Sequence, residues 1–256
     1  MTTFIRSLFG TGSFDASLIN RENERYGYSQ SQSSEVTVII PTLNEEKSIA
    51  GVIEELKRIG FSKILIVDGN SKDETVAIAE KLGVDVIHQN GHGKGDALRQ
   101  AFSYDGLSNL IVMMDADGSM RPKELASFIK TLDSGVDLVK GSRFLPGGYS
   151  EDMTFIRRMG NGLFVWLVNS IWSASYTDLC YGFAAFKKDA IKRIFPNLIS
   201  KNFEIETEIF IKVKKCGLTV AEVPSTELRR KFGKSNLSAV KDGYRILKTI
   251  IREFIF

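Results

Sequence analysis

The feature that most constrains the fold is an apolar run that ends in two acidic residues, LIVMMDADGSM at 110–120. Such a run, rich in Ile, Val and Met, is typical of a strand buried on both faces, as in a parallel sheet. In extended chain, side chains two residues apart point to the same side, so Asp115 and Asp117 should leave the strand end together. Two carboxylates about 5 Å apart repel by about 3 kcal/mol at an effective dielectric of about 20. We therefore expect a cation here; the alternative is a solvated acidic turn.

The pattern along the chain predicts the α/β class. Short β-branched strands alternate with amphipathic helices through residue 140, which indicates βαβ units and a mostly parallel, Rossmann-like sheet flanked by helices. Two capping boxes, at 42–45 and 71–74, are predicted to begin the first two helices. The strands are expected at 36–40, 64–67, 84–87, 110–114 and 137–140.

Polar residues gather where these strands end, and ligands of such sheets bind beyond the carboxyl ends of the strands. Asp68 can accept from a nucleoside, or can simply be a turn acid. The glycines at 91–95 allow a phosphate to approach a helix N-terminus, or form a mobile turn. Arg143 is suited to gripping phosphate oxygens in a bidentate manner. The candidate side chains at the strand ends are Asp68, Lys94, Asp115, Asp117 and Arg143.

Composition narrows the class of protein. The 256 residues carry 34 Lys and Arg against 31 Asp and Glu, and a net charge of +3 gives no reason to expect a nucleic-acid partner. Cys180 and Cys216 lack metal or redox spacing, which fits a reducing cytosol. No apolar stretch approaches the roughly 20 residues of a membrane span, and no secretory signal is recognised.

The chain is expected to have three parts. Residues 1–34 read as an N-terminal extension, partly flexible, with a Ser/Gln-rich end. Residues 35–228 are expected to form the α/β domain. Residues 229–256 are expected to form a basic C-terminal segment that faces a membrane and the acceptor molecule on which the domain acts.

The second half of the chain offers less specific signals. Glu204, Glu206 and Glu208 either complement a helix dipole or line a site. The apolar segment Leu163–Trp172 is a second membrane contact or part of the core. Four cations surround one glycine at 228–235. A C-terminal amphipathic helix then carries an apolar stripe and a basic stripe, and it either lies on a membrane or packs on the core with a solvated basic face. The apolar stripe is Leu237, Val240, Tyr244, Leu247, Ile251 and Phe254, and the basic one Lys241, Arg245, Lys248 and Arg252.

An ordered series of motifs resembles the GT-A fold, family 2 glycosyltransferases, and within them the dolichol-phosphate mannosyltransferase and polyprenyl-phosphate glycosyltransferase branch. The resemblance covers about residues 35–250. Its motifs are VTVIIPTLNEE (36–46), IVDGNSKDET (66–75), GKGDA (93–97), MDADG (114–118), GSRF (141–144), TDLCYGF (177–183) and RKFGKSN (230–236).

The resemblance implies a role for each site residue. The donor would be a GDP- or UDP-linked sugar, and the cofactor Mg²⁺ or Mn²⁺ held by Asp115 and Asp117. The residues bordering the nucleotide sugar would be Pro41, Asn44, Glu45, Asp68, Lys94 and Asp115. The acceptor phosphate would meet Arg229, Arg230, Lys231, Lys234 and Ser235. The residues carrying the chemistry would be Asp117, Arg143, Arg230 and Lys234.

Three positions depart from the family pattern. Gly69 replaces a second acid after the second strand, which puts recognition of the base in doubt. Ser119 stands where many relatives have a Gln, which leaves the third metal ligand unassigned. Ala184 replaces an Arg that often follows Gly-Phe, so the sugar and the acceptor are not specified.

The predicted function follows from the chemistry of the acceptor. A hydroxyl acceptor needs a carboxylate base, for which Asp178 and Glu206 are candidates. A phosphate acceptor is already anionic and needs cations instead, which the 229–235 cluster supplies. We therefore predict an inverting, metal-dependent hexosyltransferase to polyprenyl phosphate, peripheral on the cytosolic face of a membrane. The alternatives are a hydroxyl-directed transferase, a nucleotidyltransferase and a non-catalytic sugar-nucleotide binder.

Overall fold

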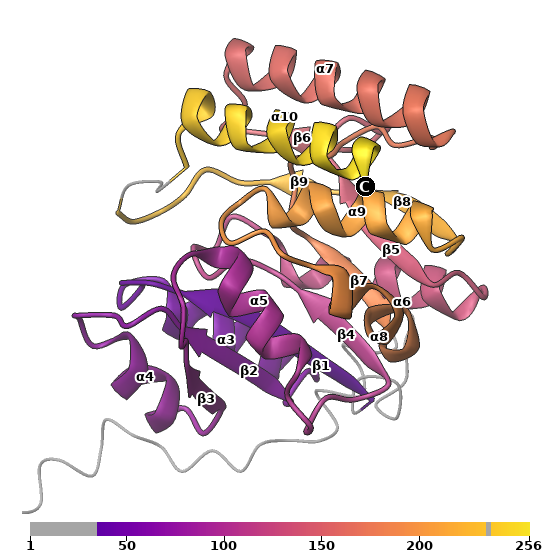
Figure 1. The fold of residues 1–256 in the computed structure, drawn as a ribbon. Helices are drawn as coiled ribbons and strands as arrows, with labels where there is room; N and C mark the ends of the chain where they lie inside the picture. The colour runs from indigo at the N-terminus through magenta and orange to yellow at the C-terminus, as the bar shows by residue number, and fades with distance from the viewer. Residues whose placement is uncertain (1–34, 234–236) are drawn as a thin grey trace, which may run out of the picture.

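The computed structural model describes residues 35–233 and 237–256 (Figure 1). The predicted α/β class and the C-terminal helix are confirmed. The strands are β1 Val36–Thr42, β2 Ile64–Asp68, β3 Asp85–His88, β4 Leu110–Met113, β5 Leu138–Ser142, β6 Tyr149–Ser150, β7 Ala184–Lys187, β8 Val220–Pro224 and β9 Thr226–Glu227. The α-helices are α3 Ile49–Arg58, α4 Thr75–Lys81, α5 Lys94–Phe102, α6 Leu125–Asp133, α7 Phe155–Trp172, α8 Lys188–Ile194, α9 Ile205–Lys215 and α10 Ala239–Ile255, with 3₁₀ turns at Pro122–Glu124 and Phe195–Asn197.

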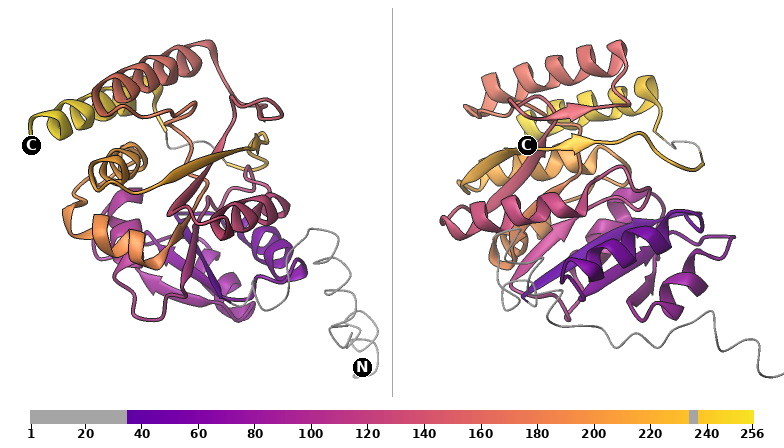
Figure 2. Two further views of the ribbon diagram at one scale, coloured as in Figure 1. Left: turned by 90° about the vertical axis from the view of Figure 1, so that its right-hand side faces the viewer. Right: turned by 180° about the vertical axis from the view of Figure 1, so that it is seen from behind.

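A seven-stranded sheet has the strand order β3-β2-β1-β4-β7-β5-β8. It lies at the centre of the molecule with helices on both sides (Figure 2). β7 runs antiparallel to both β4 and β5, and the other neighbours are parallel. The carboxyl ends of β1, β2, β4 and β5 therefore lie along the same edge. A separate pair, β6 and β9, joins two segments that are far apart in sequence.

Each face of the sheet has its own apolar core, because side chains of a strand alternate between the faces. Val38 and Ile40 of β1 pack with α3, α4 and α6, whereas Ile39 packs toward α5, α7, α8, α9 and α10. All three side chains are fully buried. The helices thus cover both faces, as the run of buried strands predicts.

The two predicted capping boxes are wrong. α3 begins at Ile49 and α4 at Thr75, later than the boxes imply, and neither Thr42 nor Ser71 caps a helix. Instead, both hydroxyls donate to the carboxylate of Asp68, at 3.3 and 2.6 Å. Because the hydroxyls of Thr42 and Ser71 are bound to Asp68, they are not available to cap these helices.

The glycine-rich loop at 91–95 also differs from its predicted role. Two N–H groups in the first turn of α5, those of Gly95 and Asp96, donate to the carbonyl of Lys201. A Cβ at Gly95 would lie 2.3 Å from the carbonyl oxygen of Ser200. These glycines permit close approach of the backbone at 200–202, and that loop occupies the place predicted for a phosphate.

We expect Gly95→Ala to destabilise the fold by about 1–3 kcal/mol, since the new methyl group must displace backbone atoms. Gly51→Ala in α3 is the matched control, because a Cβ there meets nothing within 4 Å. Relief of the glycine penalty should stabilise that variant by about 0.5–1 kcal/mol. Urea denaturation of both variants measures the difference, and equal effects would contradict the close packing.

α7 and α10 pack side by side on the outer layer, with α9 beneath α10 (Figure 1). Ile246 and Ile250 of α10 face the core. Of the predicted apolar stripe, however, four residues point outward: Val240, Tyr244, Ile251 and Phe254. The interpretation that this stripe packs on the core is therefore wrong for these four. Among the residues that the structure describes, no helix is long and apolar enough to cross a membrane.

Candidate active site

The two acids after β4 lie at the carboxyl edge of the sheet, and each is paired with a cation from elsewhere in the chain. Lys94, the first residue of α5, lies 2.5 Å from Asp115 and 2.6 Å from Glu206 of α9. Burial disfavours the ammonium charge, but the neighbouring carboxylates outweigh this effect and raise the pKa of Lys94. Burial raises the pKa of Glu206. Glu206 therefore lines the site, whereas Glu208 accepts backbone N–H groups at 199–200 and serves the fold.

Asp117 faces a different cation, Arg230. The guanidinium reaches Asp117 at 3.3 Å with one nitrogen and contacts Glu45 with the other. Asp117 also accepts the backbone N–H of Ser119 at 2.9 Å, and Glu45 accepts the hydroxyl of Ser48 at 2.7 Å. The structure thus brings together residues predicted to serve the nucleotide, the metal and the acceptor.

Asp68 lies at the end of β2, where its side chain is almost entirely buried. Besides the two hydroxyls above, it accepts the backbone N–H of Ser71 at 2.9 Å. Asn44, in the left-handed backbone region, accepts the N–H of Lys72 at 2.7 Å. These bonds hold the end of β1, which contains Pro41, and the loop after it against the end of β2 and its following loop. Direct contact of Asp68 with a base stays a prediction.

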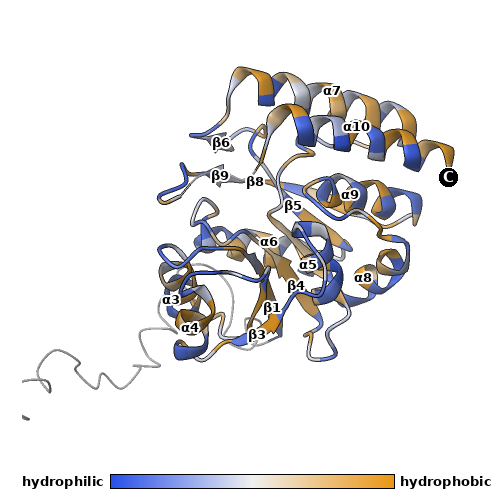
Figure 3. Ribbon diagram, turned by 60° about the vertical axis from the view of Figure 1, so that its left-hand side comes forward, coloured by the Kyte–Doolittle hydropathy of each residue, from blue (hydrophilic) through white to orange (hydrophobic). Residues whose placement is uncertain are grey.

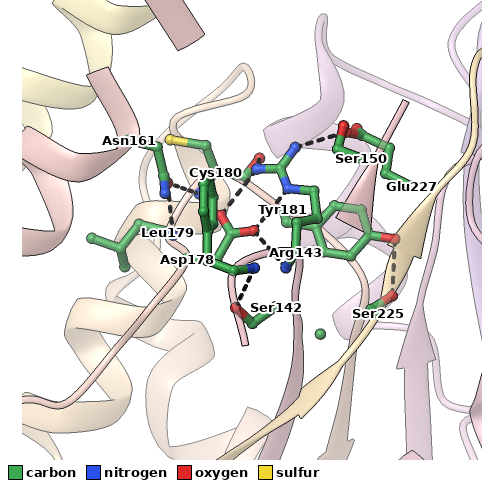
Figure 4. Close-up of polar contacts among 12 residues, drawn as sticks. Ser142, Arg143, Ser150, Asn161, Asp178, Leu179, Cys180, Tyr181, Ser225 and Glu227 are labelled. Carbon is green, nitrogen blue, oxygen red and sulfur yellow. Dashed lines mark hydrogen bonds and ion pairs between the residues drawn. The ribbon is translucent and has the colours of Figure 1, made fainter. Parts of the chain in front are cut away.

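Arg143 follows β5 and is almost completely buried in an ion-pair network (Figure 4). It donates to both oxygens of Asp178, at 2.7 and 2.9 Å, and to Glu227 at 3.0 Å. A further N–H donates to the carbonyl of Cys180. Burial would raise the pKa of Asp178, but Arg143 lowers it overall. Most donors of Arg143 are therefore used within the protein, and this guanidinium fixes the loop at 177–181.

The sequence analysis missed a second buried cation beneath this network. Lys140 is fully buried in β5 and donates to Glu222 at 3.2 Å and to the carbonyl of Gly141 at 3.1 Å. Glu222 in turn accepts the N–H and hydroxyl of Thr177. A lysine within an otherwise apolar strand was the available signal, because a buried ammonium must be paired.

A cavity of about 430 Å³ opens beside Arg143, between β6 and the start of α7. Two arginines line it: Arg143, which is paired with Asp178 and Glu227, and Arg158, whose guanidinium lies 5.5 Å from the ring centre of Phe144. The rest of the lining is largely apolar or hydroxylic: Phe144, Gly148, Tyr149, Ser150, Met153, Thr154 and Phe155.

Asp115 and Asp117 are the residues that would hold a divalent cation. Mg²⁺ is commonly bound by one or two carboxylates together with substrate phosphates, so this donor set fits. Within residues 35–233 and 237–256, no three or more His, Cys, Asp and Glu side chains are grouped to bind a metal. A third protein ligand therefore stays unassigned.

The structure describes three of the five residues predicted to bind the acceptor: Arg229, Arg230 and Lys231. Arg229 and Lys231 are exposed on either side of Arg230. Lys234 and Ser235 lie outside the described residues, as does the predicted N-terminal extension.

The sheet order, its flanking helices and the acids at the strand ends define a GT-A fold. The family model described as glycosyl transferase family 2 matches residues 37–195, more than half of the chain. The chain belongs to this family and is a glycosyltransferase.

Relatives and solved structures agree with this assignment. A dolichyl-phosphate hexose transferase of Haloferax volcanii is 30% identical over 220 residues, which is 85% of this chain and 93% of that one. A polyprenol monophosphomannose synthase of Mycolicibacterium smegmatis is 30% identical over 213 residues, 78% of this chain and 80% of the other. A glucosyl-3-phosphoglycerate synthase of Mycobacterium tuberculosis, solved with Mn²⁺ and UDP, has a TM-score of 0.69 at 18% identity, over 89% of this chain and 84% of that one.

Proposed function

We propose that this protein transfers a hexose from a nucleotide-diphosphate sugar to a polyprenyl phosphate, with inversion at the anomeric carbon. An oxygen of the acceptor phosphate forms the new bond to that carbon as the bond to the nucleotide diphosphate breaks. Asp115 and Asp117 would hold Mg²⁺ or Mn²⁺, which neutralises charge on the leaving diphosphate. The names of the relatives and the Mn²⁺ and UDP bound by the structural neighbour support this proposal.

One observation carries the choice of acceptor: the segment 226–230 connects the cavity beside Arg143 to the donor carboxylates. Glu227 binds Arg143 at the cavity, and three residues later Arg230 binds Asp117. Three residues span at most about 11 Å. An acceptor phosphate in the cavity would therefore lie close to the predicted sugar position, with its apolar chain leading toward α7.

Both candidate bases of the hydroxyl-directed alternative are bound to cations of the protein. Asp178 is fully buried and bound to Arg143, which keeps its pKa low. Glu206 is held by Lys94 at 2.6 Å. A phosphate acceptor needs neither residue as a base, because it is largely ionised at neutral pH.

The deciding experiment is a panel of radiolabelled UDP- and GDP-sugars incubated with Mn²⁺ and vesicles that contain a polyprenyl phosphate. We expect label from one donor to move into organic extract. Transfer only to water-soluble hydroxyl acceptors would support the alternative transferase. Nucleotide binding without any transfer would indicate a sugar-nucleotide binder.

The outer face of α7 and α10 supports binding to a membrane surface. Hydrophobic residues recur along the ribbons of both helices (Figure 3). The side chains of Phe155, Trp166, Tyr244 and Phe254 are each 63–76% exposed. Of the predicted basic stripe, Arg245 and Arg252 are bound to acids of the protein. The remaining two, Lys241 and Lys248, are exposed. Aromatic rings with flanking cations suit the headgroup region of an anionic bilayer.

We expect Lys241→Glu combined with Lys248→Glu to weaken binding to anionic vesicles at least 30-fold. Each cation near an anionic surface contributes about 1 kcal/mol, so loss of two corresponds to about 30-fold, and reversal adds repulsion. Lys123→Glu combined with Lys130→Glu, on exposed positions around α6, is the control with the same change in net charge. Liposome flotation measures the binding, and equal losses in both variants would contradict the assignment of this face.

A further inference from the structure

We propose that Arg230 and the donor-site divalent cation compete for Asp117, so that cation binding releases the Arg230 guanidinium from the donor carboxylates to the acceptor phosphate. This inference rests on the proposed function and adds to it the order in which the donor and the acceptor bind. The donor and its cation would bind first, and only then would the full set of acceptor cations be available.

The charges at the strand ends support this competition. Two ion-pair groups lie there: Asp115 and Glu206 share Lys94, and Asp117 and Glu45 share Arg230. With all four ionised, the acids exceed the cations by two charges, which one divalent cation would balance. A cation at Asp117 would lie within a few ångströms of the guanidinium, and like charges at that separation repel.

Arg230 is the cation of the two that can leave. Lys94 is fixed at the first residue of α5, and its departure would strand the buried carboxylate of Glu206. Arg230 instead lies on irregular chain after β9, where the backbone N–H groups of its two predecessors are bound: Leu228 donates to the carbonyl of Ser119 and Arg229 to the carboxylate of Glu151. Of its two partners, Asp117 is 18% exposed and can be rehydrated, whereas Glu45 is buried but still accepts the hydroxyl of Ser48 at 2.7 Å.

The released guanidinium has a suitable destination. Arg230 lies three residues from Glu227, which lines the network beside the cavity and its Arg143. While Arg230 is paired with Asp117, its Nε also donates to the carbonyl of Phe232 at 2.6 Å, so the backbone at 230–232 folds around the Arg230 guanidinium. Departure of Arg230 from Asp117 therefore changes the conformation of this segment, and the change can be followed without any assay of activity.

The first test measures the affinity for Mn²⁺ alone by electron paramagnetic resonance. Arg230→Ala should bind Mn²⁺ about fivefold more tightly than the wild type, since a competing partly exposed ion pair is removed. Arg229→Ala removes the same charge from the neighbouring exposed position and should change the affinity less than twofold. Unchanged or weaker binding by Arg230→Ala would overturn the competition.

The second test uses the wild-type protein and so does not depend on folding of a variant. Chymotrypsin cleavage after Phe232 should become several-fold faster when Mn²⁺ is added, whereas cleavage after the exposed Tyr149 serves as the internal control. An unchanged rate at Phe232 under saturating Mn²⁺ would equally overturn the proposal. Neither measurement requires lipid. A negative result in these two tests would therefore not argue against lipid-directed transfer, and absence of transfer in the lipid assay would not affect the measured competition for Asp117.

Discussion

Asp117→Asn should reduce sugar transfer by about 10²–10³-fold or more, because it removes the charged ligand at the position where the diphosphate leaves. The fold should persist. The Asn amide oxygen can still accept the N–H of Ser119. The Arg230 pair that it loses is partly exposed, which limits the cost to about 1 kcal/mol.

Three measurements test this expectation together: turnover in the lipid-extraction assay, thermal midpoint, and turnover in excess chelator. Asp133→Asn, at the end of α6, is the control for a lost carboxylate away from the site. Full activity of Asp117→Asn, or of the wild type after removal of divalent cations, would exclude the metal assignment.

Much of the fold could be predicted because burial dictates residue type along whole strands. The central strand, its acids and strands β1, β2, β3 and β5 follow from short apolar runs that end in polar residues, and the structure confirms each of these elements. The edge strand β8 and the antiparallel strand β7 were not predicted. The sequence of β7, AAFK, is four residues long and has no alternation to separate it from the adjoining helix.

The ion pairs of the candidate site were harder to predict, since the two residues of each pair are far apart in sequence. Lys94 pairs with Glu206, 112 residues away, and Arg230 with Glu45, 185 residues away. A local sequence pattern cannot show whether the hydroxyl of Ser71 caps a helix or donates to Asp68, because both roles require the same group. The face of α10 was ambiguous for a related reason. Its apolar stripe and the Ile246 and Ile250 pair lie on different sides, and the sequence alone does not say which one the core takes.

The buried network around Arg143 leads to the second large effect. Arg143→Ala leaves the fully buried carboxylate of Asp178 without its principal partner, and an orphaned buried charge costs about 3–5 kcal/mol. For a chain of this size, the thermal midpoint should fall by about 10 °C. Arg157→Ala is the matched control, because Arg157 and Asp152 form an Arg–Asp pair at 2.9 Å that is partly exposed. That variant should lose no more than about 1 kcal/mol.

The pH dependence separates this ion pair from simple packing. The pKa of Asp178 in the folded protein lies below its ordinary value of 3.8, so its ionised form stabilises the fold above that pH. This contribution disappears as the pH falls through the lowered pKa of the folded state. The stability difference between wild type and Arg143→Ala should therefore shrink as the pH falls. The decrease should begin above about pH 4, where the buried Asp178 of the variant, which has lost Arg143, takes up its proton first, and it should be complete below the lowered pKa of Asp178 in the wild type. Urea denaturation at several pH values measures it. A difference that stays constant from neutral to acidic pH would mean that Arg143 stabilises the 177–181 loop through packing alone, and its charge would then have no structural role in holding that loop beside the cavity.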